Sequence, residues 1–280
     1  MTKRIVSTAT IWIVILTALW CFRTPAAVVL ASLCSVLALR EFYRLQTAAG
    51  NAPFAWLGMF FGALITAAPW TEAVLGWPAH PLLAFAAVIF AIRILGERPA
   101  EKRVEALAST LFGLVYVALL LQYLVRLVTP LPGDAVSANG RLLLCVWLVA
   151  VAKSSDVGAL VTGLLCGRHK MAPVISPKKT WEGAAGGVAS SIIIGSVGAA
   201  LARGHWAGHW PAHLTPGRAA VIAVPIAVVA IISDLVESVI KRQAALKDSG
   251  RTVPGIGGVF DVVDSLLLTA PIGYFLLGMR

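Results

Sequence analysis

The chain has 280 residues, of which 59% are hydrophobic and only 13% are charged, and its formal net charge is +10. Soluble domains carry about 25% charged and about 45–50% apolar residues, so this composition excludes an ordinary soluble fold. The basic residues lie between apolar runs, and membrane topology explains this pattern more simply than nucleic-acid binding does.

Nine apolar segments follow one another along the chain and predict an all-α fold, a polytopic membrane bundle of about nine transmembrane helices. A helix needs roughly 20 apolar residues to cross the hydrocarbon core. The second and fourth segments are short and would need snorkelling ends or a locally thin bilayer. The segments are residues 5–22, 25–43, 54–75, 81–95, 107–127, 141–163, 184–202, 219–240 and 259–279.

No loop between these segments is long enough to fold alone, so we expect one membrane domain. Within it, residues 1–140 form N-terminal helices and residues 141–280 form a C-terminal catalytic region. If the N-terminus is cytoplasmic and the segments alternate, sixteen Lys and Arg residues lie inside and six lie outside. Cytoplasmic loops carry the excess of Lys and Arg, so this orientation is favoured.

The first polar stretch interrupts the sixth apolar segment, at residues 153–158. Lys153 and Asp156 are costly inside a membrane, where such residues usually face a bundle interior or a wet cavity. One interpretation is a pair three residues apart that neutralises itself on one helix face. The other is a functional position in which Asp156 contacts a substrate.

The second polar stretch, residues 176–183, comes directly before the seventh segment. Ser176 followed by Pro177 suits the N-cap and first position of a helix, whose free N–H groups attract phosphate. A positive-inside anchor would explain the two lysines of this stretch, but not its neighbouring hydroxyl and carboxyl groups. The candidate substrate-binding residues are Ser176, Lys178, Lys179, Thr180 and Glu182.

The third polar stretch, residues 233–265, is the densest. One helical face carries four polar side chains spaced i, i+3, i+4 and i+7, namely Asp234, Glu237, Ser238 and Lys241. A basic loop, a glycine-rich turn at 254–258 and two further aspartates follow. The candidate residues are Asp234, Glu237, Ser238, Lys241, Arg242, Lys247, Asp248, Gly257, Gly258, Asp261 and Asp264.

The carboxylates of this third stretch are suited to Mg²⁺, which takes one or two carboxylates and completes its shell with water and substrate phosphates. The neighbouring bases would hold a triphosphate, because nucleotidyl transfer mainly needs positioning and neutralised charge. The alternative is a salt-bridged hairpin between two helices. Ionisable residues inside spans are functional more often than not, which favours the first interpretation.

The same residues resemble the hallmark of the phosphatidate cytidylyltransferases, also called CDP-diglyceride synthases. The resemblance covers about residues 150–270. Three positions depart from the family pattern, as in a divergent member. Ile256 stands where the family commonly has His, Val262 where it commonly has Arg, and Val253 where it has a bulkier apolar residue, which is a minor change. The matching positions are Asp156–Ala159, Gly167–Arg168, Ile175–Gly183, Ser238–Arg242, Lys247–Gly250, Pro254, Gly257, Gly258, Asp261 and Asp264.

The resemblance implies a metal-dependent reaction in which phosphatidate attacks the α-phosphorus of CTP, giving CDP-diacylglycerol and pyrophosphate. It implies metal ligation by Asp234 and Asp261, with Asp264 and Asp248 in support, and leaves open a monovalent cation beside Mg²⁺. Lysines and arginines of the second and third stretches would neutralise phosphate. The implied catalytic set is Asp234, Lys241, Lys247, Asp248, Asp261 and Asp264.

Further expectations concern partners and location: CTP and phosphatidate, the bilayer, no nucleic acid, a homodimer, and the bacterial inner (cytoplasmic) membrane. Two other functions stay open. One is a CTP-dependent enzyme that acts on another lipid phosphate, because lipid tails are read by general apolar surface. The other is a transporter of an anionic metabolite, although the charges lie toward one face and no half of the chain repeats.

Overall fold

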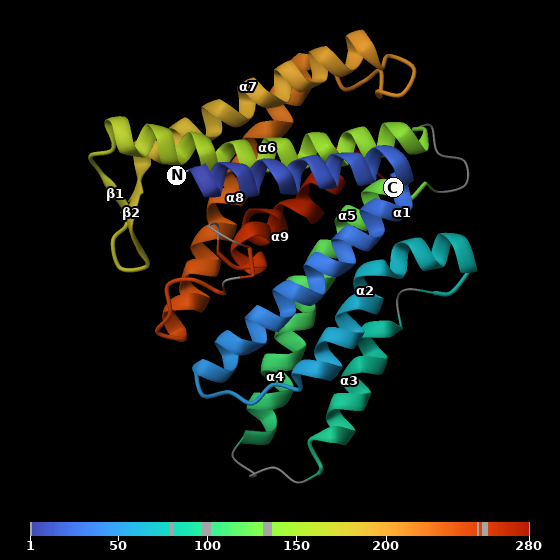
Figure 1. The fold of residues 1–280 in the computed structure, drawn as a ribbon, viewed down its shortest axis with the longest axis vertical. Coiled ribbons are helices and arrows are strands. Elements are labelled where there is room, and N and C mark those ends of the chain that lie inside the picture. Colours follow the sequence, from blue (N-terminus) through green and yellow to red (C-terminus); the bar gives the residue numbers. More distant parts are fainter. Residues whose placement is uncertain are drawn as a thin grey trace. The chain divides into compact units, whose positions relative to one another are not determined.

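The computed structural model describes residues 2–78, 81–96, 102–130, 136–250, 252–253 and 257–279, with side chains from residue 17 onward. Almost all elements are helices (Figure 1). They are α1 (Thr2–Ala48), α2 (Ala55–Leu75), α3 (Leu82–Arg93), α4 (Arg103–Gly113), the π-helix η2 (Leu114–Leu119), α5 (Leu120–Val128), α6 (Ala138–Cys166), α7 (Trp181–His205), α8 (Pro216–Gln243) and α9 (Val259–Leu276), with strands β1 (Lys170–Ala172) and β2 (Ser176–Thr180).

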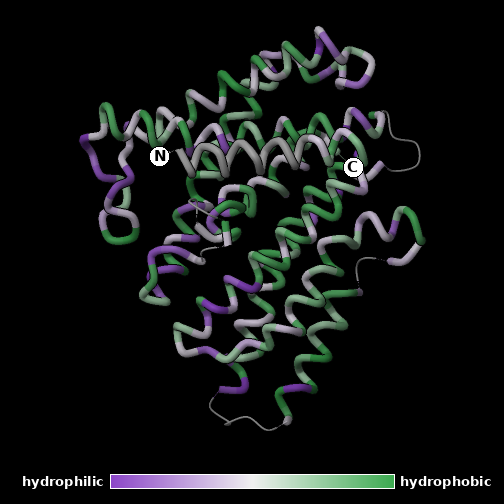
Figure 2. The backbone as a smooth tube through the Cα atoms, in the orientation of Figure 1, coloured by the Kyte–Doolittle hydropathy of each residue, from purple (hydrophilic) through white to green (hydrophobic). Residues whose placement is uncertain are grey.

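Within the described residues, seven helices are long and apolar enough to cross a membrane, which confirms a polytopic all-α membrane protein. In Figure 2 the hydrophobic colours run along these helices, whereas hydrophilic colours gather at the β1–β2 hairpin and after α8. The seven are Thr17–Ala48, Ala55–Leu75, Arg103–Val128, Ala138–Cys166, Trp181–His205, Pro216–Gln243 and Val259–Leu276.

The first and second predicted segments lie in one long helix, α1, and the fourth lies in the short helix α3. The second is longer than predicted, because its helix continues to Ala48 rather than ending at residue 43. Arg23 (φ 49°, ψ −127°) separates it from the first segment, as the break between two apolar runs predicts. The fourth is short, as expected: Leu82–Arg93 has 12 residues. The total of nine spans and the cytoplasmic N-terminus stay predictions.

The chain forms two compact units. One consists of Met1–Thr129 and Ile240–Val263, and is called here the N-terminal unit; the other consists of Pro130–Val239 and Asp264–Arg280, and is called the C-terminal unit. The last residues of α8 and the first of α9 thus belong to the N-terminal unit. The assignment of residues 141–280 as the catalytic region stays a prediction.

The N-terminal unit is built around an aromatic centre on α1. Tyr43 is 1% exposed, and its hydroxyl donates to the carbonyl oxygen of Thr110 over 3.0 Å. Gly58 and Gly113 leave room for its ring, since a Cβ at either position would lie 2.3–2.6 Å from it. Phe42 packs against Phe260 at the start of α9, with ring centroids 5.9 Å apart. Aromatic packing therefore brings the start of α9 onto α1.

The C-terminal unit is built on the pair α6 and α7, which lie side by side. Small residues allow the close approach, as at many helix interfaces in membranes. A Cβ on Gly158 would lie 2.1 Å from the Ser190 hydroxyl, and one on Gly186 would lie 2.0 Å from that of Thr162. The Ser190 hydroxyl donates to the carbonyl oxygen of Ser154 over 2.6 Å. This packing fixes the second polar stretch relative to Lys153 and Asp156.

Candidate active site

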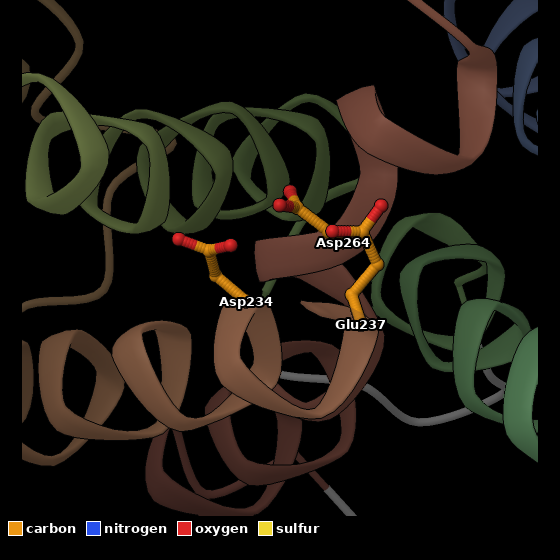
Figure 3. A group of neighbouring side chains, drawn as sticks. All are labelled: Asp234, Glu237 and Asp264. Carbon is orange, nitrogen blue, oxygen red and sulfur yellow. The ribbon is translucent and has the colours of Figure 1, made fainter. Parts of the chain in front are cut away.

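Three carboxylates converge in the C-terminal unit. Asp234 and Glu237 come from successive turns of α8 and Asp264 from α9, and Figure 3 shows the three side chains gathered together. One oxygen from each lies within 4.8 Å of the others. Glu237 is 0% exposed and Asp264 is 8% exposed. Buried carboxylates are costly without compensating partners, so this acidic cluster marks a site rather than an incidental surface.

Lys153 joins α6 to the acidic cluster. Its ammonium group lies 3.2 Å from Asp156 and 3.3 Å from Asp264. The predicted pair of Lys153 and Asp156 therefore exists, but it does not neutralise itself alone, because Asp264 shares the lysine. This arrangement joins the first and third polar stretches, which are more than 100 residues apart in the sequence.

Lys179 joins the second polar stretch to the same cluster, since its ammonium group lies 2.7 Å from Asp234. Beside this pair is a cavity of about 420 Å³. One part of its wall is polar and carries both lysines of the stretch, and another part is apolar. The lining includes Asp156, Lys178, Lys179, Thr180 and Asp234, together with Ala159, Leu160, Leu164, Met171 and Ile231. Anionic and apolar parts of one ligand could both be accommodated there.

The predicted helix start at Ser176 and Pro177 is wrong. Residues 176–180 form β2, which pairs antiparallel with β1, and α7 begins at Trp181. Thr180 is the N-cap, and its hydroxyl accepts from the backbone N–H of Gly183 over 3.1 Å. Strand pairing holds the preceding residues in an extended conformation, so Ser176 cannot cap a helix. Thr180 is buried and lines the cavity, which brings the N-terminus of α7 to its wall.

Glu182 ties the hairpin to α7. Its carboxylate accepts from the backbone N–H groups of Arg168 (3.1 Å) and His169 (3.2 Å), and one oxygen lies 2.5 Å from His169 Nδ1. These contacts give Glu182 a positioning role for β1 and β2. Lys178 is exposed and lines the cavity, whereas Ser176 is half-buried in β2.

Asp261 occupies a second polar cluster, in the N-terminal unit. Its carboxylate lies 2.9 Å from the Lys241 ammonium group and accepts from the backbone N–H groups of Ser249 (3.1 Å) and Gly258 (2.8 Å). Among the described residues, the cluster of three neighbouring acids therefore contains Glu237 and does not contain Asp261. Its predicted role as a metal ligand stays a prediction.

The other predicted residues of the third stretch differ in exposure. Ser238 is buried, whereas Arg242, Lys247 and Asp248 are exposed and open to solvent or a ligand. Gly257 has φ +139°, a backbone conformation that favours glycine. Ile256, one of the departures from the family pattern, lies outside the described residues, as do Arg251 and Pro254.

The chain matches a known protein family over nearly its whole length. The model of the cytidylyltransferase family matches residues 2–279. The chain belongs to the cytidylyltransferase family. This family transfers nucleotidyl groups, so the chain is an enzyme, and the transporter alternative is set aside.

Curated relatives of this cytidylyltransferase carry a more specific name. A phosphatidate cytidylyltransferase of Synechocystis is 31% identical over 277 residues, which cover 91% of this chain and 88% of the relative. That of Mycobacterium leprae is 34% identical over 183 residues (65% and 53%). That of Brucella suis is 42% identical over 131 residues (46% and 44%). The resemblance read from the motifs is thereby confirmed.

The acidic cluster of this cytidylyltransferase fits a divalent cation. Three carboxylate oxygens from two helices meet within 4.8 Å, and hard cations such as Mg²⁺ take oxygen ligands. Two lysines contact the cluster, Lys153 through Asp264 and Lys179 through Asp234.

Two residues of the cytidylyltransferase escaped sequence reasoning. Lys153 lay in a recognised stretch but was not placed among the site residues, since only the fold brings it to Asp264. Glu41 was missed altogether. It is 1% exposed and contacts Ser249 and Thr252, about 210 residues away. In the sequence it follows Arg40 near the end of an apolar run, where a charged residue is ordinary; its isolation as the sole acid in residues 1–71 was the available signal.

Proposed function

We propose that this cytidylyltransferase transfers the cytidylyl group of CTP to phosphatidate, with CDP-diacylglycerol and pyrophosphate as products. The observation that carries the proposal is the cavity beside the acidic cluster, whose wall combines Lys178 and Lys179 with apolar side chains. Such a wall suits a ligand with phosphate and lipid parts. The names of the relatives from Synechocystis and Mycobacterium leprae point to the same substrate.

In this reaction a phosphate oxygen of the lipid forms a bond to the α-phosphorus of CTP. The bond from that phosphorus to the β-phosphate oxygen breaks, and pyrophosphate leaves. The attacking group is already an anion, so no strong general base is needed. The main tasks of the protein are to position the two anions and to neutralise their charge.

The family resemblance assigns basic residues of each unit to phosphate binding. In the C-terminal unit, Lys178 and Lys179 line the cavity and would bind phosphate oxygens, while Thr180 and Glu182 hold the start of α7 and the hairpin. In the N-terminal unit, Lys241, Arg242 and Lys247 would contact triphosphate or lipid phosphate. The family resemblance assigns Ser238, Gly257 and Gly258 to substrate binding and Asp248 to support of the metal.

Asp234, Glu237 and Asp264 would hold Mg²⁺, and Asp261 stays proposed as a further ligand. Bound Mg²⁺ would neutralise phosphate charge and polarise the α-phosphate. Lys153 keeps Asp264 and Asp156 oriented, since its ammonium group contacts both carboxylates. A monovalent cation beside Mg²⁺ remains part of the proposal.

The proposed setting is the bacterial inner membrane, with nine spans, a cytoplasmic N-terminus and a homodimeric assembly. The excess of Lys and Arg on one side of the alternating segments supports this orientation. It would bring the three polar stretches to the cytoplasmic side, where CTP is found.

The proposal is tested by incubating the purified protein in detergent with labelled CTP, Mg²⁺ and either phosphatidate or an isoprenoid phosphate. We expect labelled CDP-diacylglycerol and one pyrophosphate per product, with a kcat/KM for phosphatidate at least a hundredfold above that for the isoprenoid phosphate. The reverse preference would assign the enzyme to another lipid phosphate. Absence of both products from folded protein would refute cytidylyl transfer to lipid.

A further inference from the structure

Glu41 is a buried acid in α1, and in the sequence it is far from every recognised motif. Only 1% of it is exposed, and it lies in the helical stretch Thr17–Ala48, which is apolar enough to span a membrane. A carboxylate in such a place is strongly destabilising unless hydrogen bonds compensate the lost hydration. We therefore expect hydrogen-bond donors beside the Glu41 carboxylate.

Among the residues that the structure describes, the compensating groups come from the third polar stretch. The carboxylate of Glu41 accepts from the Ser249 hydroxyl (2.9 Å), the Thr252 hydroxyl (2.6 Å) and the backbone N–H of Phe260 (2.8 Å). Two of these donors lie between α8 and α9, and the third lies in the first turn of α9. One side chain of α1 therefore binds Ser249, Thr252 and Phe260 within the N-terminal unit.

The contact with Phe260 also caps a helix. The first N–H groups of an α-helix have no partner within the helix, and a side-chain oxygen of the preceding residue usually supplies one. Here α9 begins at Val259, and the preceding residue, Gly258, has no side chain. Glu41 accepts the N–H of Phe260 in its place, and Asp261 accepts that of Gly258 over 2.8 Å. Two negative charges also favour a helix N-terminus.

Glu41 gives a reason for two glycines of the family motif. A Cβ on Gly258 would lie 2.1 Å from Glu41 Oε2, and one on Gly250 would lie 2.6 Å from Glu41 Oε1. Real Cβ atoms do not approach so closely. In this chain a carboxylate from another helix therefore occupies the space that a side chain at either position would need.

Ser249 connects Glu41 to the site. Its hydroxyl oxygen lies 2.9 Å from Glu41 Oε2 and 2.9 Å from Asp261 Oδ2, and its backbone N–H donates to Asp261. Asp261 in turn contacts Lys241. We infer that Glu41 is a positioning residue of the active site, which holds Ser249 and Phe260 so that Asp261 and Lys241 keep their arrangement. The inference rests on the proposed function, because that function assigns Lys241 and its basic neighbours to phosphate binding.

The variant that tests it is Glu41→Gln. The amide keeps the shape of the side chain but replaces one acceptor oxygen with a donor, so the donors of Ser249, Thr252 and Phe260 can no longer all be satisfied. Glu72→Gln is the matched control, since Glu72 is an exposed residue of α2 in the same unit.

Hydrogen–deuterium exchange and calorimetric titration with CTP are the two measurements. We expect exchange at the amides of Ser249 and Phe260 to accelerate at least tenfold in Glu41→Gln and to stay unchanged in Glu72→Gln. We also expect the Kd for CTP to rise at least fivefold with unchanged stoichiometry. Mere loss of folded protein would instead lower the stoichiometry and leave the Kd as it was.

Unchanged exchange would overturn the inference, and so would an unchanged Kd with reduced stoichiometry, because Glu41 would then only stabilise the fold. If wild type binds CTP but converts no phosphatidate, the proposed function fails while the effect of Glu41→Gln on the Kd still supports the inference. Wild type that binds no CTP would overturn both.

Discussion

At the scale of single residues, the site depends on a few charged side chains shared between partners. Lys153 contacts both Asp156 and Asp264, and Ser249 contacts both Glu41 and Asp261. A shared partner fixes two groups at once, so its removal disturbs more than one contact. Sequence spacing indicated the pair Lys153 and Asp156, but the sharing follows from tertiary packing.

Lys153→Met should reduce kcat at least tenfold. Methionine keeps much of the length and packing of the side chain but leaves Asp156 and Asp264 without their common cation, so the two carboxylates repel and rearrange. The measurement is steady-state CDP-diacylglycerol formation at saturating CTP. Lys170→Met, on the exposed side chain of β1, is the control and should keep kcat within twofold. Equal activity of the two variants would remove Lys153 from the site.

Gly258→Ala should lower the thermal unfolding midpoint and the activity together. The added methyl group would overlap Glu41 Oε2 and Ser249 Oγ, each 2.1 Å from its position, and overpacking of this kind costs about 1–3 kcal/mol. Gly204→Ala in α7 adds the same methyl group where no atom lies within 4 Å, so it should be neutral or slightly stabilising. An unfolding midpoint in Gly258→Ala as high as in Gly204→Ala would contradict the close contact with Glu41.

At the scale of elements, the sequence predicts most helices because apolar length alone determines what can span a bilayer. The segment at 141–163 thus became α6 and that at 219–240 became α8. The start of α7 was predicted wrongly, since Ser176 and Pro177 form a good local signal that pairing of β1 with β2 overrides. The acidic pair of Asp234 and Glu237 followed from helical spacing, but its meeting with Asp264 required tertiary structure.

Thr180→Val should destabilise the enzyme by about 1 kcal/mol, because valine has nearly the same shape but cannot accept the N–H of Gly183. Ser176→Ala is the control, and it should have little effect on stability if Ser176 belongs to β2 as observed. Both variants are compared by thermal unfolding in detergent. The opposite ranking would restore Ser176 as the cap of the helix.

At the scale of the whole molecule, orientation in the membrane decides whether the site meets CTP. The alternation of apolar segments predicts that the β1–β2 hairpin is cytoplasmic and that residues 206–215 are outside. In a variant without the four native cysteines, Lys170→Cys should react with an impermeant maleimide only from the cytoplasmic side. Gly208→Cys should react only from the other side. Reaction of both from one side would refute the nine-span topology.

The central claim is that the acidic cluster of Asp234, Glu237 and Asp264 supports Mg²⁺-dependent cytidylyl transfer to phosphatidate. It is tested most directly by measuring CDP-diacylglycerol formation by wild type, Asp264→Asn and the exposed control Glu72→Gln over a range of Mg²⁺ concentrations. We predict Mg²⁺-dependent product from wild type and the control, and at least a hundredfold lower kcat in Asp264→Asn, with all three proteins folded. Wild-type activity in Asp264→Asn would contradict the claim.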